Sequence, residues 1–265
     1  MASRAEPLHR RRGVPVAPFL LPLVGLTATL AVWELAPRTG LVRRTSVPVF
    51  SDVAAEMWAT LQDPVFWREL QSSSGRWAIG LALAIAIGVP LGMLMGRSRP
   101  FWRLIDPLLV VSYPVPKAAL ILIFVLWWGA GDLSRIVIII TGCLIPIVIS
   151  SYHGANSIEP RLLWSARNLG TDRVRSLFKV VLPAGLPQIL SGLRLAIAIS
   201  IFTLLASELL IRQSGIGAYM FGMLDVGRNM RVWAVMVLLA CIGFLLDFVY
   251  VRLVRLTLPW IEGDV

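Results

Sequence analysis

Six stretches of the 265-residue chain are long and apolar enough to cross a lipid bilayer as helices. A helix needs about 20 apolar residues to span the hydrocarbon core of a membrane. The composition agrees, because 57% of the residues are hydrophobic and only 15% are charged, which is far more apolar than a water-soluble domain. Backbone groups in lipid must be hydrogen-bonded within their own segment, so the sequence predicts an all-α membrane protein, a bundle of six transmembrane helices. The six stretches are residues 16–36, 77–95, 104–128, 136–151, 189–211 and 232–251.

The expected organisation is a single six-span membrane domain, residues 16–255, between a basic tail, residues 1–15, and a second tail, residues 256–265. Apolar residues in segment 47–61 recur at helical spacing, which predicts an amphipathic helix on the outer membrane surface. This helix either packs at the interface or docks a partner. A cleaved signal peptide is the alternative for the first span, but the segment is long and no small-x-small cleavage site follows it.

The formal net charge of +10 is not gathered on a soluble domain, so we expect no nucleic-acid partner. The Lys and Arg residues flank the spans, where they meet membrane lipid. With the amino terminus inside, the inner segments hold more of them than the outer ones. The positive-inside rule therefore favours cytoplasmic positions for both termini and for the polar segment 159–183.

Segment 159–183 reads as a helix-turn-helix loop between the fourth and fifth spans. Apolar residues fall on one face of each predicted helix, and Gly170 suits the left-handed end of the first. Thr171 or Asp172 can cap the second helix, which is expected to end at Leu182-Pro183. From these residues alone, an ordinary cytoplasmic loop whose arginines touch lipid phosphates is an equally good interpretation. The two apolar stripes are Leu162, Leu163, Ala166 and Leu169, then Val174, Leu177, Phe178, Val181 and Leu182.

Ala166, Gly170 and Leu182-Pro183 stand at the spacing of the EAA loop of ABC-transporter import permeases, and the chain resembles that family. In that loop a Glu-Ala-Ala start is followed by a glycine and then by Leu-Pro. Here Trp164 replaces the opening glutamate and Ser165 the first alanine, which puts any contact made by that glutamate in doubt. Other segments, over roughly residues 70–260, resemble the branch that imports nitrate, sulfonates and taurine. They are Tyr113-Pro-Val-Pro-Lys-Ala-Ala-Leu, Leu126-Trp-Trp-Gly-Ala-Gly-Asp, Glu208-Leu-Leu and Gly215-Ile-Gly217.

The resemblance implies a permease subunit in the bacterial inner membrane with a cytoplasmic coupling loop. Two copies of a separate ATPase subunit would clasp that loop and bind the ATP, so no cofactor and no catalytic residue are expected in this chain. It lacks the Gly-x-x-x-x-Gly-Lys-Ser/Thr phosphate loop. A periplasmic or lipid-anchored solute-binding protein and a second permease copy, most simply a homodimer, complete the expected assembly. The coupling-loop residues are Trp164, Ser165, Ala166, Arg167, Leu169, Gly170, Leu182 and Pro183.

Polar residues inside spans are costly and tend to face a cavity or a partner, so a few mark the translocation path. Lys117 follows two prolines that break the third helix; it either offers a cation to an anionic solute or satisfies the freed carbonyls. Glu208 either gates the path or, as favoured here, pairs with Arg212 one turn later. Ser207 is expected to bond back to its own helix. The path candidates are Tyr113, Pro114, Pro116, Lys117, Ser207 and Glu208, and the candidates for an outer turn or hinge are Gly215 and Gly217.

Arg194 and Asp247, near the inner ends of their spans, should form a salt bridge or extend to the interface. Cys143 and Cys241 are expected to be packing residues, with no metal site.

Two rival classes are weaker. An intramembrane enzyme needs a nucleophile with a base or clustered metal ligands, yet the only histidines are His9 and His153. An ion-coupled secondary carrier tends to show inverted repeats, and no repeat is detectable. Lys117 and the basic charge favour an anion such as a sulfonate, taurine or nitrate as the solute, with a thiamine-precursor-like solute as the alternative.

Overall fold

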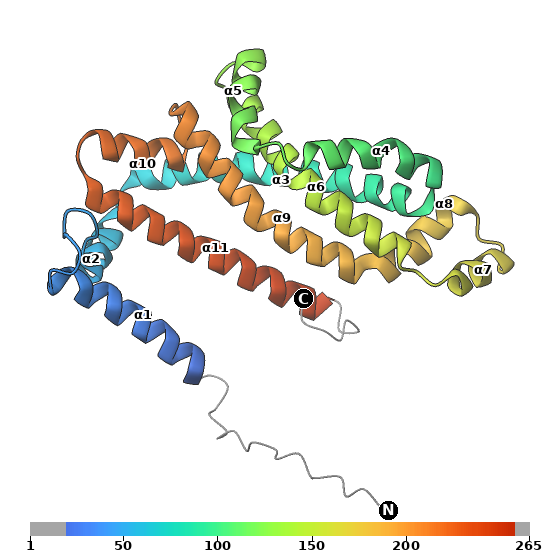
Figure 1. Ribbon diagram of the computed structural model, residues 1–265, viewed down its shortest axis with the longest axis horizontal. Helices are drawn as coiled ribbons and strands as arrows, with labels where there is room; N and C mark the ends of the chain where they lie inside the picture. Colours follow the sequence, from blue (N-terminus) through green and yellow to red (C-terminus); the bar gives the residue numbers. More distant parts are fainter. Residues whose placement is uncertain (1–19, 258–265) are drawn as a thin grey trace, which may run out of the picture. The chain divides into compact units, whose positions relative to one another are not determined.

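The computed structural model describes residues 20–257, and every regular element within them is a helix, which confirms the predicted all-α class (Figure 1). Residues 1–19, with the basic tail and the start of the first predicted span, lie outside the described residues, as do residues 258–265. The elements are α1 (Leu20–Arg38), α2 (Phe50–Leu61), α3 (Pro64–Arg97), α4 (Arg99–Ser112), α5 (Lys117–Trp128), α6 (Asp132–Asn156), α7 (Pro160–Asn168), α8 (Arg173–Ser176), the π-helical η1 (Leu177–Val181), α9 (Leu182–Ile211), α10 (Ile216–Asp225) and α11 (Asn229–Thr257).

Four of the described helices are long and apolar enough to cross a membrane, and the count becomes five if the bent pair α4–α5 is one span. The four are α3, α6, the continuous helix Val174–Ile211 and α11. α1 is not among them: its described part is short and carries Glu34, Pro37 and Arg38 near its end. The protein is therefore a multi-pass membrane protein with four or five described candidate spans.

The chain divides into two compact units, Met1–Glu56 and Met57–Val265. In the first unit, the carboxylate of Glu34 accepts hydrogen bonds from the backbone N–H and the hydroxyl of Ser51, at 3.0 and 3.1 Å. The indole of Trp33 donates to the carbonyl of Pro48 at 3.0 Å. These bonds fasten the end of α1 to the start of α2, within the segment predicted to be amphipathic.

In the second unit, α3, α6 and α9 form the core, with α6 packed along both α3 and α9 (Figure 1). Close approach depends on glycine. A Cβ atom on Gly92 of α3 would lie 2.4 Å from the carbonyl oxygen of Val148 in α6, and one on Gly192 of α9 would lie 2.2 Å from the Cβ of Ser150. Small residues let membrane helices pack this tightly by van der Waals contact. The buried apolar cluster between the three helices comprises Leu81, Ala84, Ile139, Cys143, Ile147, Ala196 and Leu204.

Asp63 joins three helices at the amino-terminal end of α3. One carboxylate oxygen accepts the N–H of Val65 at 2.9 Å and so caps α3. The other accepts the hydroxyl of Tyr219 in α10 at 2.9 Å and a guanidinium N–H of Arg231 in α11 at 3.3 Å. This end of the unit is thus closed by polar bonds between segments far apart in the sequence.

The break predicted in the third span is confirmed. α4 ends at Ser112 and α5 begins at Lys117, and the two helices are bent by 99°. Pro114 and Pro116 lie in the break, where a missing N–H and a fixed φ prevent a continuous helix. Segment 104–128 is therefore an angled pair of helices.

The expected helix end at Leu182-Pro183 is wrong, because helix continues through η1 into α9 as far as Ile211. Within η1 the hydrogen bonds widen, and the N–H of Leu182 bonds to the carbonyl of Leu177, five residues earlier. Pro183 follows in the first turn of α9. The π-helical turn directly before Pro183 accommodates the proline, so the helix does not end here.

Candidate functional site

The first candidate site is the turn between α7 and α8, in the predicted coupling loop. Gly170 has a φ of 78°, the left-handed conformation expected of it. Its N–H bonds to the carbonyl of Arg167 at 2.9 Å, and the N–H of Thr171 bonds to that of Ala166 at 3.0 Å. The carboxylate of Asp172 accepts the N–H of Arg175 at 2.7 Å, so Asp172 is the cap. The turn is therefore fixed by its own backbone bonds.

The apolar side chains of this loop divide into a buried and an exposed set, which corrects the two predicted stripes. Leu163 and Ala166 are buried, and Leu163 packs with Met93 and Val181. Leu169, expected on the same face, is 85% exposed because it stands at the end of α7 and no longer follows the helical rotation. The exposed set, called here the elbow patch, comprises Leu162, Trp164, Leu169, Val174 and Phe178.

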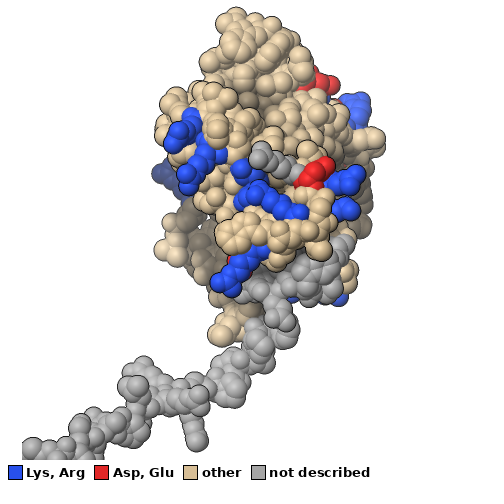
Figure 2. Space-filling model, turned by 90° about the vertical axis from the view of Figure 1, so that its right-hand side faces the viewer, with Lys and Arg blue, Asp and Glu red and all other residues tan. Residues whose placement is uncertain are grey.

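Basic side chains surround the elbow patch. Figure 2 shows this end of the molecule, with Lys and Arg side chains spread over it and few acidic ones. Those exposed on the loop itself are Arg161, Arg167, Arg175 and Lys179. Large apolar residues that are exposed together and rimmed by polar ones mark an interaction surface for a protein or a membrane, and the elbow patch has this character. Ser165 and Pro183 are also exposed, and Leu182 is half-buried.

The second candidate site is the break between α4 and α5. Lys117 donates hydrogen bonds to the carbonyls of Ser112 and Val115, the latter at 3.1 Å. Of the two expectations for this lysine, the structure favours the one in which it satisfies the carbonyls freed by the prolines. Tyr113, Pro114 and Pro116 are exposed on the surface of the chain.

Lys117 also lines a largely apolar, open-sided cavity of about 410 Å³ whose walls come from α3, α4, α5 and α6. The other polar side chains that the described residues place on its wall are the hydroxyls of Ser112 and Thr141. Thr141 bonds to carbonyls of its own helix, at 3.1 and 2.9 Å. The cavity thus offers a cation and two hydroxyls within apolar walls, the composition expected of a site for a small anion with an apolar part.

The third candidate site surrounds Glu208 of α9, whose side chain is fully buried. Its carboxylate accepts hydrogen bonds from the hydroxyl of Ser73 at 2.7 Å, the guanidinium of Arg76 at 2.9 Å and the N–H of Gly217 at 3.1 Å. The favoured pairing with Arg212 is therefore wrong. α9 ends at Ile211, and Arg212 adopts a left-handed conformation that aims its side chain elsewhere.

Arg212 instead lies over the ring of Phe221, 3.3 Å from the centroid.

Ser207 bonds back to the carbonyl of Leu204 at 2.6 Å, as expected. Gly215, with a φ of 102°, makes the turn before α10. A Cβ atom there would lie 2.1 Å from the carboxylate of Glu208, so close contact with the glutamate explains why glycine fits. Gly217 lies inside α10.

Arg135 and Asp132 complete this cluster together with Arg76. Arg76 of α3 bonds to Asp132 at 2.7 Å and to the hydroxyl of Ser214 at 2.7 Å. Arg135 of α6 approaches Asp132 at 3.4 Å and Ser214 at 3.0 Å. Only Asp132 is well exposed, so the cluster of Arg76, Arg135, Asp132 and Glu208 is a balanced set of two positive and two negative charges, mostly inside the bundle.

Arg76 was not among the predicted site residues, because the apolar stretch of the second span begins only at residue 77 and Arg76 was placed in the loop before it. α3 begins at Pro64, so Arg76 lies well inside the helix. The available signal was a basic residue directly before an apolar stretch, with Ser73 one turn earlier and Glu69 two turns earlier on the same helical face. Elsewhere, Arg194 and Asp247 form the expected salt bridge, at 2.7 Å.

Comparison with known proteins gives consistent matches. Residues 88–259 match the family of binding-protein-dependent transport system inner membrane components. The chain is 29% identical to the taurine transport system permease protein TauC of Escherichia coli (strain K12) over 98% of each chain. It is 33% identical to the putative aliphatic sulfonates transport permease protein SsuC of the same organism over 92% of each. Among solved structures, a chain of the MetNI methionine ABC transporter in inward-facing conformations aligns with a TM-score of 0.64 at 19% identity, covering 72% of this chain and 95% of that one. The last match concerns the fold.

Proposed function

Because this chain belongs to the family of binding-protein-dependent transport system inner membrane components and is a permease subunit of an ABC importer, we propose that it carries small organic sulfonates through the membrane. It is not an enzyme, and the ATPase is a separate subunit. An ATPase and a solute-binding protein are its partners. The family excludes the secondary-carrier and intramembrane-enzyme alternatives.

The proposed assembly contains two copies of this permease and two ATPase subunits, which bind the ATP. Six spans, the first over residues 16–36, place both termini and loop 159–183 in the cytoplasm of a bacterial cell. The distribution of Lys and Arg supports this orientation. A cysteine introduced at Arg161, after replacement of the native Cys143 and Cys241, should react with a membrane-impermeant thiol reagent only in permeabilised cells. Labelling in intact cells would contradict the orientation.

Coupling to the ATPase occurs at the elbow patch. The observation that carries this proposal is the exposure of apolar side chains on a loop whose turn is fixed by Gly170 and Asp172. Trp164, at 61% exposure, presents an apolar surface where the family motif has a glutamate. A rigid loop transmits a push to the helices behind it, as alternating access requires.

The path includes the cavity beside Lys117, where the lysine is the one charged group that the described residues place on the wall. A sulfonate would compete with the carbonyls of Ser112 and Val115 for the ammonium group, and its apolar part would contact the surrounding side chains. Hydrogen bonds to charged groups are worth about 1.5–3 kcal/mol, so Lys117→Gln should raise the KM for sulfonate uptake roughly 10- to 100-fold. An unchanged KM would contradict the proposal that Lys117 contacts the solute on the translocation path.

The coupling proposal is tested in liposomes that contain the permease, the ATPase and the solute-binding protein. Leu169→Asp places a charge in the elbow patch, and Gly170→Pro removes the left-handed turn. Both should abolish uptake and stimulated ATP hydrolysis while the chain still inserts into the membrane. Leu41→Asp is the matched control, because Leu41 is 81% exposed in a different loop. Uptake that persists in both elbow variants would contradict coupling at this surface.

A further inference from the structure

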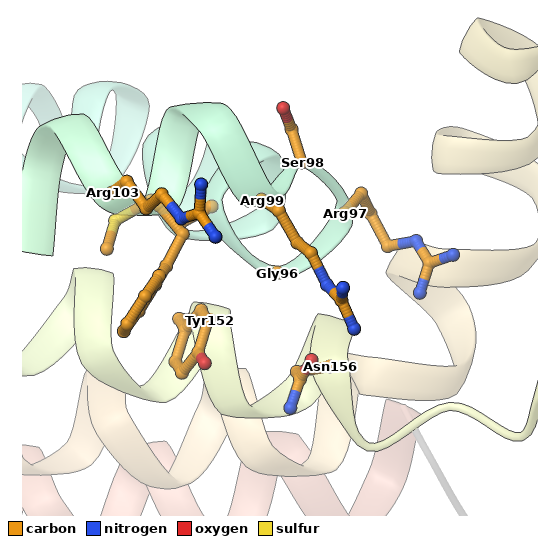
Figure 3. Close-up of a pocket in the computed structure, with 9 residues that line it drawn as sticks. Gly96, Arg97, Ser98, Arg99, Arg103, Tyr152 and Asn156 are labelled. Carbon is orange, nitrogen blue, oxygen red and sulfur yellow. The ribbon is translucent and has the colours of Figure 1, made fainter.

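A second cavity, of about 420 Å³, lies where α3 turns into α4 and combines three arginines with polar and aromatic walls (Figure 3). Arg97 ends α3, and Arg99 and Arg103 come from the first turns of α4. Tyr152 and Asn156 form the opposite wall from the last turns of α6, and Trp102 completes the lining. In Figure 3, Arg99 extends toward Asn156 of α6, whereas Arg97 points away from Arg99 and Arg103.

The positive charge of this cavity is not neutralised within described residues 20–257. No ion pair joins Arg97, Arg99 or Arg103 to a carboxylate there, and no acidic side chain lines the cavity. Three guanidinium groups in one hollow repel one another, and a bound anion would relieve that repulsion. The cavity lies within the roughly 300–1,000 Å³ typical of small-ligand sites.

The donors suit a phosphate group. Guanidinium groups bind phosphate oxygens with two parallel hydrogen bonds, which a carboxylate or a phosphate can accept. The hydroxyl of Tyr152 and the amide of Asn156 add neutral donors from the other wall. Tryptophan is typical of the headgroup level of a membrane, and Trp102 stands beside the arginines.

The surroundings favour a lipid as the source of that phosphate. α4 carries arginines at its amino-terminal end and buries none of its residues within the chain. Leu104 and Val111 follow the arginines along α4 and are 65% and 71% exposed. A helix with basic residues beside an apolar surface is the form that lies at a membrane interface. A free phosphate ion would gain nothing from these apolar side chains, whereas acyl chains would cover them.

We propose that Arg99 and Arg103 bind the phosphate of an anionic phospholipid, such as phosphatidylglycerol or cardiolipin, with its acyl chains along α4, while Arg97 adds positive charge at the edge of the cavity. The site also borders the coupling loop. Arg97 and Ser98 line an adjoining cavity of about 390 Å³ whose other wall includes Leu163 and Arg167 of α7. A bound lipid therefore steadies the base of the loop. Any effect on coupling rests on the proposed function, but lipid binding does not.

Native mass spectrometry of the purified full chain tests the proposal. Protein incubated with mixed phosphatidylcholine and phosphatidylglycerol micelles should retain phosphatidylglycerol preferentially. The attraction of one basic residue to an anionic lipid surface corresponds to about a fivefold change in lipid retention. The double variant Arg99→Gln with Arg103→Gln should therefore lower retention of phosphatidylglycerol roughly 25-fold. The matched control, Arg252→Gln with Arg255→Gln, removes two exposed arginines from the end of α11 and should change retention less than about twofold.

A conservative double variant controls for loss of lipid binding through misfolding. Arg99→Lys with Arg103→Lys keeps the charge and should retain more phosphatidylglycerol than the glutamine pair. Equal retention in the two pairs, an equal loss in the α11 control, or no preference for phosphatidylglycerol would overturn the proposal. Displacement of the lipid by excess inorganic phosphate would instead identify a site for soluble phosphate and overturn the lipid assignment. Binding is measured on the permease alone, so this outcome is independent of uptake by the assembled importer.

Discussion

The buried pair Arg76–Glu208 should be a major source of stability, and Glu208→Gln tests this directly. The two side chains are 7% and 0% exposed, and their closest atoms are 2.9 Å apart. The substituted glutamine amide would still accept a hydrogen bond, but Arg76 and Arg135 would then share a single carboxylate, that of the exposed Asp132. Removing one partner of a buried ion pair costs about 3–5 kcal/mol, because the other charge is left without compensation.

A double-mutant cycle separates the pair from its surroundings. Arg76→Gln should cost a similar amount, since it leaves Glu208 with only the neutral donors of Ser73 and Gly217. The double variant leaves no uncompensated charge from the pair. Its loss in free energy of unfolding should therefore be smaller than the sum of the losses of the two single variants. The expected difference is on the order of 2–3 kcal/mol, near the upper end for groups in direct contact.

Thermal unfolding of the purified chain in one detergent provides the measurement. At about 2–4 °C per kcal/mol, each single variant should lower the midpoint by roughly 6–20 °C. Glu159→Gln, at an exposed position in loop 159–183, is the control and should stay within about 0.5 kcal/mol of the parent. Losses that simply add in the double variant, or a Glu208→Gln midpoint equal to the control, would refute the reasoning.

Two further predictions use the same assay. Gly192→Ala should lower the free energy of unfolding by about 1–3 kcal/mol, because the added Cβ would lie 2.2 Å from the Cβ of Ser150. Gly243→Ala is the control and should leave stability unchanged, because its Cβ would meet no atom within 4 Å. Equal effects of the two substitutions would contradict the packing argument. Burial alone would raise the pKa of Asp63, but the N–H of Val65 and the hydroxyl of Tyr219 hydrogen-bond to its charged form and lower the pKa overall. The stability that Asp63 contributes is thus complete above the ordinary carboxyl pKa of about 3.9 and is lost as the pH falls through the lower folded value. Between neutral pH and pH 3, the unfolding midpoint of the parent protein should therefore fall by more than that of Asp63→Asn. Equal falls would show that protonation of Asp63 does not contribute to the loss of stability in acid.

Features set by neighbouring residues could be predicted from the sequence. Proline chemistry placed the break between α4 and α5, and the left-handed preference of glycine placed the turn at Gly170. Apolar length identified α3, α6, α9 and α11 as candidate spans, with ends that shifted by several residues. The end of the loop's second helix was mispredicted because a π-helical turn accommodates Pro183, and no propensity rule at single positions anticipates that turn.

Contacts between distant residues could not be predicted in the same way. Arg76 and Glu208 are 132 positions apart, and their pairing depends on the rotation of α3 against α9. That rotation follows from the glycine contacts of α6 with both helices, which a single sequence does not specify. Local pairing at four residues favoured Arg212 as the partner, yet the helix ends before such a pair can form. The division of the loop's apolar residues into a buried set and the exposed elbow patch has the same cause, because Leu163 and Val181 are buried against Met93, in a different helix.

The continuity of helix Val174–Ile211 links the elbow patch to the cluster around Glu208. Its 38 residues extend about 57 Å at 1.5 Å per residue, more than the roughly 40–45 Å of a whole bilayer. At one end lie Val174 and Phe178, and at the other Glu208 is fixed by bonds from α3 and α10. Under the proposed coupling, a push on the elbow patch therefore meets a helix anchored at its far end. The displacement is then absorbed where the helical hydrogen bonding is irregular, at η1, whose Leu177 and Val181 line one cavity with Arg97.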